Sequence, residues 1–328
     1  MKTIAFVGGV GKTTLVYHLA HMLPRIGYPT VAVDLDPQAN LTAAFFDEER
    51  LETLWEENGS ETIMGCLSPI LDGTGDIGRP TSLAIPESEN LWLIAGNLGL
   101  SRFEDELSDS WPRGYEGKES ALRTTSAFYR IIQVAANEVG AVVALVDVGP
   151  NLGAINRATL LAADYLVIPL AADLFSLQGL RNLGPTVRTW RNNWKTHVLD
   201  AHKPPFDLPK GAMTPAGYVV LQHAVRLDRP VKAFAKWIGR IPIEYRKSVL
   251  GIEETVLPQR EQEEHELASL RNYRSLMPMA QEARKPMFDL TAADGALGGH
   301  GQLVELCKKE FQGLAERIAE RCGLQKQF

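Results

Sequence analysis

One stretch decides the fold, and it reads Gly8-Gly9-Val10-Gly11-Lys12-Thr13-Thr14. It follows an apolar segment, 3–7, and precedes a helical pattern over 13–23, in which leucine and methionine recur at helical spacing. Glycines let backbone N–H groups curl around phosphate oxygens, and a helix N-terminus adds the positive end of its dipole. Strand, glycine turn and helix in this order predict a phosphate-binding loop.

The polar residues of this loop suit a nucleoside triphosphate. Lys12 can bridge the β- and γ-phosphates, and the Thr13 hydroxyl can be a ligand of Mg²⁺. A glycine-rich turn with a solvent-exposed lysine is the plainer alternative. The ordered run of strand, loop, lysine, hydroxyls and helix favours the phosphate site.

The rest of the chain alternates short β-branched segments with longer helical patterns, which is typical of a parallel sheet flanked by helices. The expected strands are 3–7, 30–34, 91–95, 141–147, 166–170 and 217–221. The fourth is apolar until its last residue, Asp147, so we expect it to be central. We predict a doubly wound α/β fold with a mostly parallel sheet. Residues 1–328 are expected to form one domain, with surface excursions near 48–90 and 104–120.

Composition favours a cytoplasmic protein. The chain has 328 residues, of which 45% are hydrophobic and 23% charged. No stretch approaches the roughly 20 apolar residues that span a bilayer, and no cleavage site follows the first apolar segment. The three cysteines have neither paired nor metal-ligand spacing, which fits a reducing compartment.

The loop departs from the general pattern G-x-x-x-x-G-K-[ST], because Phe6 takes the place of the first glycine. The variant GGVGKTT resembles the ParA/MinD family of ATPases, whose deviant Walker A motif reads KGGVGKTT. Segment 34–42 (DLDPQANLT) resembles the family's DxDPQGN switch segment, and segment 147–153 (DVGPNLG) its Walker B segment. Segments within 162–180 resemble the family's next stretch, and weaker similarities at 241–242 and 285–290 extend the resemblance over nearly the whole chain.

The resemblance implies ATP and Mg²⁺ as cofactors, with the seven loop residues holding the phosphates and Lys12 assisting catalysis. Asp147 would hold the metal through a bound water, together with Thr13. Asp36 would orient the attacking water within the metal site, with Asp34 close by. From their positions, Gln222 and Pro242 are expected to contact the base.

One departure from the family affects the expected activity. Val7 stands where the family carries a second lysine, which reaches the partner's nucleotide across a homodimer. Lys2 lies at the other end of the strand and cannot replace it. A cation at the γ-phosphate matters by orders of magnitude in rate. We expect nucleotide binding to persist, whereas efficient hydrolysis and ATP-driven dimerisation lose the charge that this lysine supplies. Either another basic residue substitutes, or the chain is a slow or silent ATPase.

Basic residues gather in segment 181–247, which holds 13 Lys/Arg against 4 Asp/Glu although the whole chain has a net charge of −6. Partition members of the family bind DNA without sequence preference through such residues, and a ParB-like or other partner protein activates them. The same residues also suit a solvated helix face whose aromatic side chains pack inward. Non-specific DNA is therefore one expected partner.

Two further features have a structural explanation. The amphipathic helix expected over 301–322 carries several glutamates, so we predict that it packs on the sheet and does not bind membrane. His18 and His21 have i,i+3 spacing without a third ligand in view. We interpret them as histidines on the surface of the first helix.

The leading hypothesis is a ParA-like switch, in which ATP drives dimerisation and the dimer acts in DNA or plasmid partition or in cargo positioning. A P-loop metabolic enzyme, such as an amide ligase or a dethiobiotin-synthase-like protein, is the rival from another class. A regulatory protein that binds nucleotide without turnover is another alternative, because of Val7. A metal-cluster carrier is disfavoured, because the chain has no Cys-x-x-Cys pair.

Overall fold

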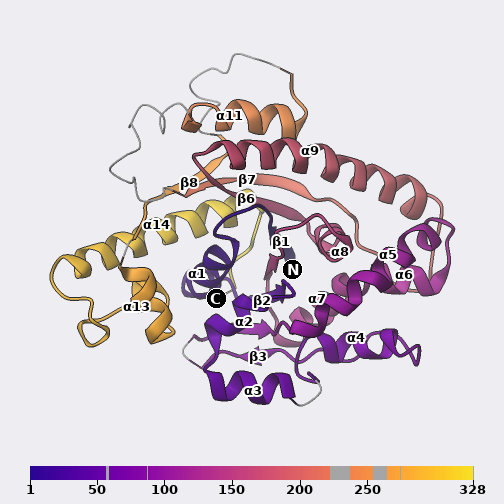
Figure 1. The fold of residues 1–328 in the computed structure, drawn as a ribbon, viewed down its shortest axis with the longest axis horizontal. Coiled ribbons are helices and arrows are strands. Elements are labelled where there is room, and N and C mark those ends of the chain that lie inside the picture. The colour runs from indigo at the N-terminus through magenta and orange to yellow at the C-terminus, as the bar shows by residue number, and fades with distance from the viewer. Residues whose placement is uncertain (57–58, 87, 222–236, 254–263, 274, 328) are drawn as a thin grey trace.

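The computed structural model describes residues 1–56, 59–86, 88–221, 237–253, 264–273 and 275–327. Its centre is an eight-stranded sheet with the order β3-β4-β2-β5-β1-β6-β7-β8 (Figure 1). The short β3 pairs antiparallel to β4, and the other pairings are parallel. The strands are β1 (Lys2–Phe6), β2 (Thr30–Leu35), β3 (Leu83–Ala84), β4 (Leu91–Ile94), β5 (Val143–Val148), β6 (Tyr165–Ala171), β7 (Thr214–Leu221) and β8 (Glu266–Leu270).

Helices cover both faces of this sheet. The α-helices are α1 (Lys12–Arg25), α2 (Asn40–Phe45), α3 (Glu48–Glu56), α4 (Ile63–Leu71), α5 (Arg102–Tyr115), α6 (Glu119–Thr125), α7 (Ala127–Val139), α8 (Ala154–Ala162), α9 (Leu174–Trp194), α11 (Ile241–Glu244), α13 (Leu276–Ala283) and α14 (Gly299–Arg321). Shorter 3₁₀ segments are η1 (Leu98–Ser101), η4 (Met287–Asp289) and η5 (Ala292–Asp294). Two π-helical segments, η2 (Lys195–Leu199) and η3 (Tyr245–Leu250), continue α9 and α11.

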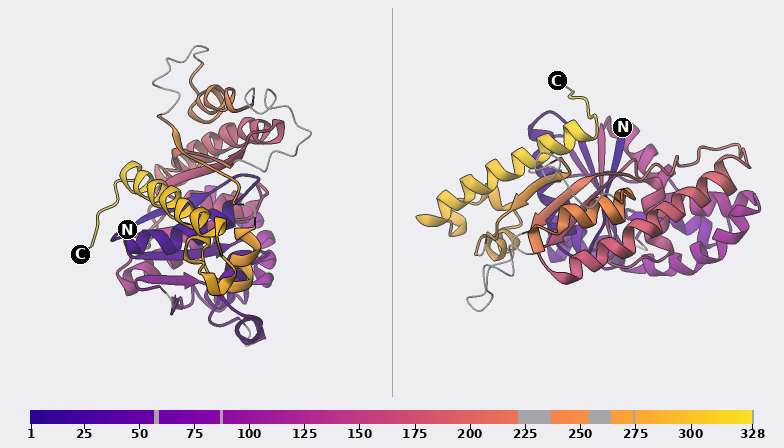
Figure 2. Two further views of the ribbon diagram at one scale, coloured as in Figure 1. Left: turned by 90° about the vertical axis from the view of Figure 1, so that its left-hand side faces the viewer. Right: turned by 90° about the horizontal axis from the view of Figure 1, so that it is seen from above.

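Alternation along the strands divides the interior into two apolar cores. In β1, Ala5 belongs to a core with α7, α8 and α9, whereas Ile4 and Phe6 belong to a core with α1 and α14. The two sets of helices therefore lie on opposite faces of the sheet (Figures 1 and 2). Strands buried on both faces explain why the central segments of the sequence are almost continuously apolar.

The doubly wound α/β prediction is confirmed. Each of the six expected strands corresponds to an observed one, and β5 is central, between β2 and β1. Strands β3 and β8 were not predicted from the sequence. The former has only two residues, and the latter, ELASL, contains no β-branched residue, so neither carries a strand signal. Helix α1 runs two residues beyond the expected end and includes Pro24 in its last turn.

The excursions expected near 48–90 and 104–120 contain regular structure. The first holds α3, α4 and β3, and α5 covers most of the second. Their apolar side chains, such as Leu67 and Leu107, are buried in the same core as α7 and α8. These segments therefore add to the central α/β cores.

The C-terminal helix packs on the sheet, as predicted. Phe311, Leu314 and Ile318 of α14 are buried in the core that also contains α1. Over the residues that the structure describes, no helix has the length and apolar character needed to cross a bilayer.

Candidate phosphate and metal site

The glycine-rich loop connects β1 to α1 at the carboxyl edge of the sheet, and two of its glycines are required by their surroundings. Gly8 has φ +154°, and a Cβ placed on it would lie 2.9 Å from the carbonyl oxygen of Pro169. Gly11 has φ +67°, precedes the first turn of α1, and has the Leu221 side chain against the position of its missing Cβ. Only glycine fits both positions without strain. The loop is thus shaped to expose backbone N–H groups at a helix N-terminus.

Lys12 is held inside this loop. Its side chain is largely buried, and Nζ donates a hydrogen bond of 2.7 Å to the Gly8 carbonyl. Burial lowers the pKa of the ammonium group, while the carboxylates of Asp147 and Asp36 oppose that shift. Besides the hydrogen bond to the Gly8 carbonyl, the Lys12 ammonium group has further N–H donors that can bond a phosphate oxygen.

Asp147 and Thr13 form the strongest indication of a metal site. Thr13 Oγ1 donates a hydrogen bond of 2.6 Å to Asp147 Oδ2. The other oxygen, Oδ1, is buried without a hydrogen-bond partner among the described residues. Burial, followed by the charge of Asp34, raises the pKa of Asp147 to about 7. A hydroxyl and an unsatisfied carboxylate oxygen are donors that fit Mg²⁺, which commonly takes few protein ligands besides phosphate oxygens.

The two aspartates of the switch segment differ in their roles. Asp34 is fully buried, lies opposite Asp147 in the β2–β5 register, and accepts hydrogen bonds from the Thr42 amide (2.8 Å) and hydroxyl (2.7 Å). Asp36 Oδ1 accepts a hydrogen bond of 3.0 Å from the Gln38 amide. Both aspartates therefore lie close to Asp147, and hydrogen bonds from Thr42 hold the Asp34 carboxyl group in place.

Sequence reasoning missed two residues that hold the Walker B segment. Asn156 Nδ2 donates a hydrogen bond of 2.8 Å to the Gly149 carbonyl. Glu104 accepts hydrogen bonds from the amides of Ala154 (2.5 Å) and Ile155 (2.9 Å), at the start of α8. Glu104 is far from this helix in the sequence and belongs to no motif, so only the fold reveals its role.

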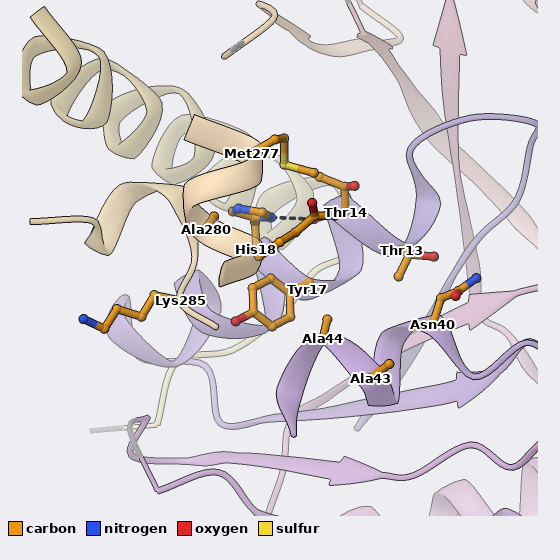
Figure 3. Close-up of a pocket in the computed structure, with 11 residues that line it drawn as sticks. Thr13, Thr14, Tyr17, His18, Asn40, Ala43, Ala44, Met277, Ala280 and Lys285 are labelled. Atoms are coloured by element: carbon orange, nitrogen blue, oxygen red, sulfur yellow. Dashed lines mark hydrogen bonds between the residues drawn. The ribbon is translucent and has the colours of Figure 1, made fainter. Parts of the chain in front are cut away.

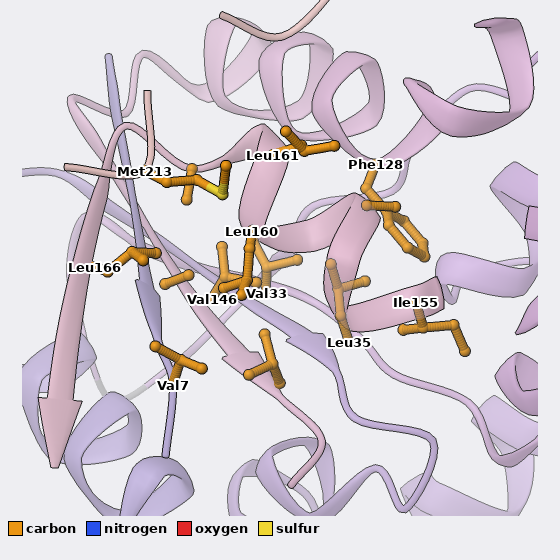
Figure 4. Packing of buried hydrophobic residues seen from close by; sticks show 14 of the residues in the cluster. Val7, Val33, Leu35, Phe128, Val146, Ile155, Leu160, Leu161, Leu166 and Met213 are labelled. Atoms are coloured by element: carbon orange, nitrogen blue, oxygen red, sulfur yellow. The ribbon is translucent and has the colours of Figure 1, made fainter. Parts of the chain in front are cut away.

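Val7 lies beside a cavity that adjoins the first half of the loop. Its side chain is only 4% exposed and belongs to the core that also contains Val146 and Leu160 (Figure 4). A cavity of about 290 Å³ lies between the first half of the loop, the Walker B segment and α9. No lysine or arginine is among its described lining residues. The described lining of this cavity therefore supplies no cation in place of the family's second lysine.

The two residues expected at the base are not placed in the site. Pro242 lies in α11, which packs on the outer side of α9 (Figure 1). Gln222 lies outside the described residues. Both assignments stay predictions.

The basic residues of α9 and its continuation are engaged within the chain. Arg181, Arg188, Arg191 and Lys195 each contact an acceptor of the same chain. Burial also lowers the pKa of Arg191. Arg181 bonds the Glu244 carboxylate, and Lys195 bonds the Asp200 carboxylate. Arg188 donates to the Val249 carbonyl, and Arg191 donates to the Met213 carbonyl. The basic residues 226, 229, 232 and 236 lie outside the described part of the chain.

The two histidines of α1 are not on its surface, so that interpretation was wrong. His18 and His21 are 2% and 4% exposed. His18 Nδ1 bonds the Thr14 carbonyl (2.7 Å), and Nε2 accepts from the Met287 amide (3.1 Å). Helix α14 and the segment after α13 cover this face of α1, and no local sequence pattern indicates that cover. Among the described residues, no three His, Cys, Asp or Glu side chains are arranged so that they could hold a metal ion by themselves.

Comparison with known proteins agrees with this geometry. A family model described as an AAA domain matches residues 1–199, which include the loop, the switch segment and the Walker B segment. The chain belongs to the ParA/MinD family of P-loop ATPases. This ParA/MinD-family chain is 29% identical over 192 residues to the sporulation initiation inhibitor protein Soj of Bacillus subtilis, covering 58% of the chain and 66% of Soj.

Other relatives extend the comparison. The cell division protein PomZ of Myxococcus xanthus is 29% identical over 199 residues, 60% of this chain and 53% of PomZ. The chain thus spans between about half and two thirds of the length of these curated relatives. Protein DIP2308 of Corynebacterium diphtheriae has the same fold, with a TM-score of 0.67, 22% identity and 98% of both chains covered. An ATP complex of a Cyanothece McdA variant follows at a TM-score of 0.61 and 16% identity, covering 100% of this chain and 98% of that one.

Proposed function

We propose that this chain binds ATP with Mg²⁺ and works as a ParA-like dimerisation switch in the cytoplasm, built from one domain. The observation that carries the proposal is the hydrogen bond from Thr13 to Asp147, whose Oδ1 lies buried near the Lys12 ammonium group without a hydrogen-bond partner among the described residues. A magnesium ion with its phosphate ligands would satisfy that oxygen.

Each residue has a separate part in holding the nucleotide. The loop amides and Lys12 would bind the phosphates, and Thr13 and Asp147 would hold the metal. Asp36, fixed by the Gln38 amide, would orient the attacking water. The bound cation would supply neutralisation of charge on the phosphates.

Exposed apolar side chains support the homodimer. Leu152, Leu174 and Phe175 are 39%, 54% and 85% exposed, and Leu152 and Phe175 line the cavity beside the loop. Large apolar side chains that gather at a site rim favour a partner surface. A second copy of the chain would cover them while closing over the nucleotide.

Hydrolysis is proposed to be slow. The buried Val7 side chain provides no charge, and the cavity beside it has no basic lining residue in the described chain. Without the second cation that the family's additional lysine would bring to the transferred phosphate, the rate should stay low even when ATP is bound. A slow switch would be reset chiefly by a ParB-like or other activating partner, which could supply the missing charge.

The cargo is proposed to be DNA or another large assembly. PomZ is named as a cell division protein, and a Caulobacter vibrioides relative, 26% identical over 190 residues, is named as the chromosome partitioning protein ParA. DNA contact would fall to basic residues of segment 181–247, as expected from the sequence. Such binding would weaken steeply with salt.

The test is light scattering coupled to size-exclusion chromatography, with and without ATP and Mg²⁺, on the chain and on its Lys12→Ala variant. We expect an ATP-dependent dimer for the chain and a monomer for the variant. A mass that nucleotide does not change, in protein shown to bind ATP, would refute the dimerisation switch. Stimulation of ATP turnover by small carboxylic acids, and not by DNA with a partner protein, would favour a metabolic enzyme.

A further inference from the structure

Two cavities adjoin different parts of the phosphate loop. The larger, about 480 Å³, lies between α1, α2 and α13, and because Thr13 and Thr14 line it, it continues the site proposed for the nucleotide (Figure 3). The smaller, about 290 Å³, is the cavity beside Val7. Its volume is near the lower end of the range of roughly 300–1,000 Å³ for pockets that hold small molecules. It therefore has room for one large side chain.

The cavity beside Val7 has an apolar inner wall and an open mouth. Its buried lining residues are apolar and at most 6% exposed, namely Val7, Ile168, Leu170, Leu180 and Leu183. Gly9 of the loop, Asn151 of the Walker B segment and Asn182 of α9 also line it, and these three are exposed. Another molecule can therefore reach the cavity, and its inner wall favours an apolar group.

A glycine of α9 keeps this mouth open. Gly179 lines the cavity, and a Cβ placed on it would meet no atom within 4 Å outside the adjoining helix backbone. Its φ is not positive, so the backbone does not require glycine, and alanine would be more favourable inside a helix. What glycine provides at this position is the free space beside Phe175, one helical turn earlier.

Phe175 presents an aromatic ring at the same mouth. The residue lines the cavity and is 85% exposed. It lies in the first turn of α9, which is held by two hydrogen bonds. Asp173 Oδ1 accepts one from the Ser176 amide (2.8 Å), and Ser176 Oγ accepts the other from the Ala171 amide (2.9 Å). A ring on a fixed turn loses little conformational freedom on binding, which favours it as an interface anchor.

A ring and a cavity on one surface complement a second copy of that surface. In a dimer with twofold symmetry both subunits use the same patch, so a residue that enters the partner's cavity is matched by the partner's equivalent residue. Leu152 and Leu174, which are 39% and 54% exposed, would extend the apolar contact. Asn151 and Asn182 would form its polar rim.

We propose that the cavity beside Val7 receives the Phe175 ring of a second copy of this chain, and that the two copies exchange this contact. The contact presupposes the proposed homodimer and specifies how its copies meet. Gly8 and Gly9 form part of the cavity wall, so the ring would pack against the loop that holds the phosphates. A nucleotide that orders the loop would favour the contact, which links the dimer to ATP. Val7 keeps the inner wall apolar.

Gly179→Leu tests the cavity. A leucine in a helix points back toward the N-terminus, here into the space beside Phe175. We expect the variant to bind ATP as the unchanged chain does, while its ATP-dependent dimerisation weakens about 10-fold or more. Gly313→Leu is the matched control, because Gly313 is also a helical glycine with no atom near the position of its Cβ. Sedimentation velocity with ATP and Mg²⁺ compares them, and an equally strong Gly179→Leu dimer would overturn the proposal.

A mixture of two variants distinguishes a contact between copies from an effect within one copy. Phe175→Ser lacks the ring and keeps the cavity, whereas Gly179→Leu keeps the ring and lacks the cavity. Each variant's own dimer loses both contacts, but the mixed dimer retains one. Native mass spectrometry with ATP and Mg²⁺ should therefore show the mixed dimer above its statistical share. A mixed dimer at or below that share would contradict the proposal.

Three outcomes separate this contact from the proposed function. An ATP-dependent dimer that is unaffected by Gly179→Leu refutes the contact and leaves the switch standing. A dimer that forms without nucleotide, but is lost in Gly179→Leu, refutes the switch and supports the contact. A chain that stays monomeric with ATP bound refutes both.

Discussion

Asp34 and Asp147 lie opposite each other on adjacent parallel strands, and both carboxyl groups are buried. Burial, opposed by hydrogen bonds from Thr42, raises the pKa of Asp34 to about 6, and that of Asp147 is raised to about 7. Two buried acids in contact with one site cannot both ionise at low cost near neutral pH. Near neutral pH the pair therefore holds protons in part, and a bound cation would replace them.

This pair predicts a pH dependence of metal-assisted nucleotide binding. Because a metal ligand must be deprotonated, affinity for ATP with Mg²⁺ should rise as the pH increases towards about 7 and then level off. Below about pH 6, where both carboxyl groups hold protons, the benefit of Mg²⁺ should be lost. Calorimetry in buffers of different ionisation enthalpy measures the protons released. Binding without proton release between pH 6 and 7 would contradict this account.

Asp147→Asn tests the metal role directly. The amide keeps the size of the side chain but removes its charge, so Mg²⁺ should no longer strengthen nucleotide binding, a loss of about 10- to 100-fold. Binding without Mg²⁺ should change little. Asp173→Asn, which changes a carboxylate that caps α9 on the other side of the loop, is the matched control and should keep the Mg²⁺ effect.

The loop backbone gives a prediction with an internal control. Gly11→Ala requires a left-handed alanine and displaces the Leu221 side chain, which should cost about 1–3 kcal/mol and weaken ATP binding. Gly9→Ala meets no atom within 4 Å and no unfavourable φ, so the variant should fold normally. Chemical denaturation compares the two. Equal stability of both variants would show that the loop does not have this shape.

The buried histidines predict a loss of stability in acid. Burial lowers the pKa of His18 to about 4, below its unfolded value of 6.5. The unfolded chain therefore binds the proton first, and the contribution of neutral His18 is lost as the pH falls from about 6.5 to 4, on the order of 3 kcal/mol. His18→Gln keeps a donor and an acceptor without titrating. The difference in unfolding free energy between chain and variant should shrink or reverse over this pH range, and a constant difference would contradict it.

The exposed rim predicts which residues join two copies. Phe175→Ser should weaken ATP-dependent dimerisation at least about 10-fold while leaving ATP binding unchanged, because the side chain is 85% exposed and lies outside the phosphate cradle. Leu297→Ser is the control, since Leu297 is 64% exposed and lies just before α14. Sedimentation velocity at several protein concentrations distinguishes them. A dimer that survives Phe175→Ser would place the interface elsewhere.

Much of the site was predictable because it depends on local sequence. The strand, the glycine turn and the start of the helix can be recognised within about a dozen residues. Asp34 and Asp147 lie near the ends of two further parallel strands, whose carboxyl ends meet at one edge of the sheet. The partners of these groups were not predictable. Glu104 reaches α8 from another helix, and His21 is covered by a segment near the C-terminus. Such contacts depend on packing between distant segments, which leaves no periodic pattern.

The central claim is that residues 8–14 hold a triphosphate with one divalent ion. Isothermal titration calorimetry of folded protein with ATP, in the presence of Mg²⁺, tests it most directly. We predict saturable binding of one ATP per chain, weakened about 10- to 100-fold by Lys12→Ala because a charge-assisted contact is lost. Absence of binding heat at several temperatures, or equal binding by the Lys12→Ala variant, would contradict the account.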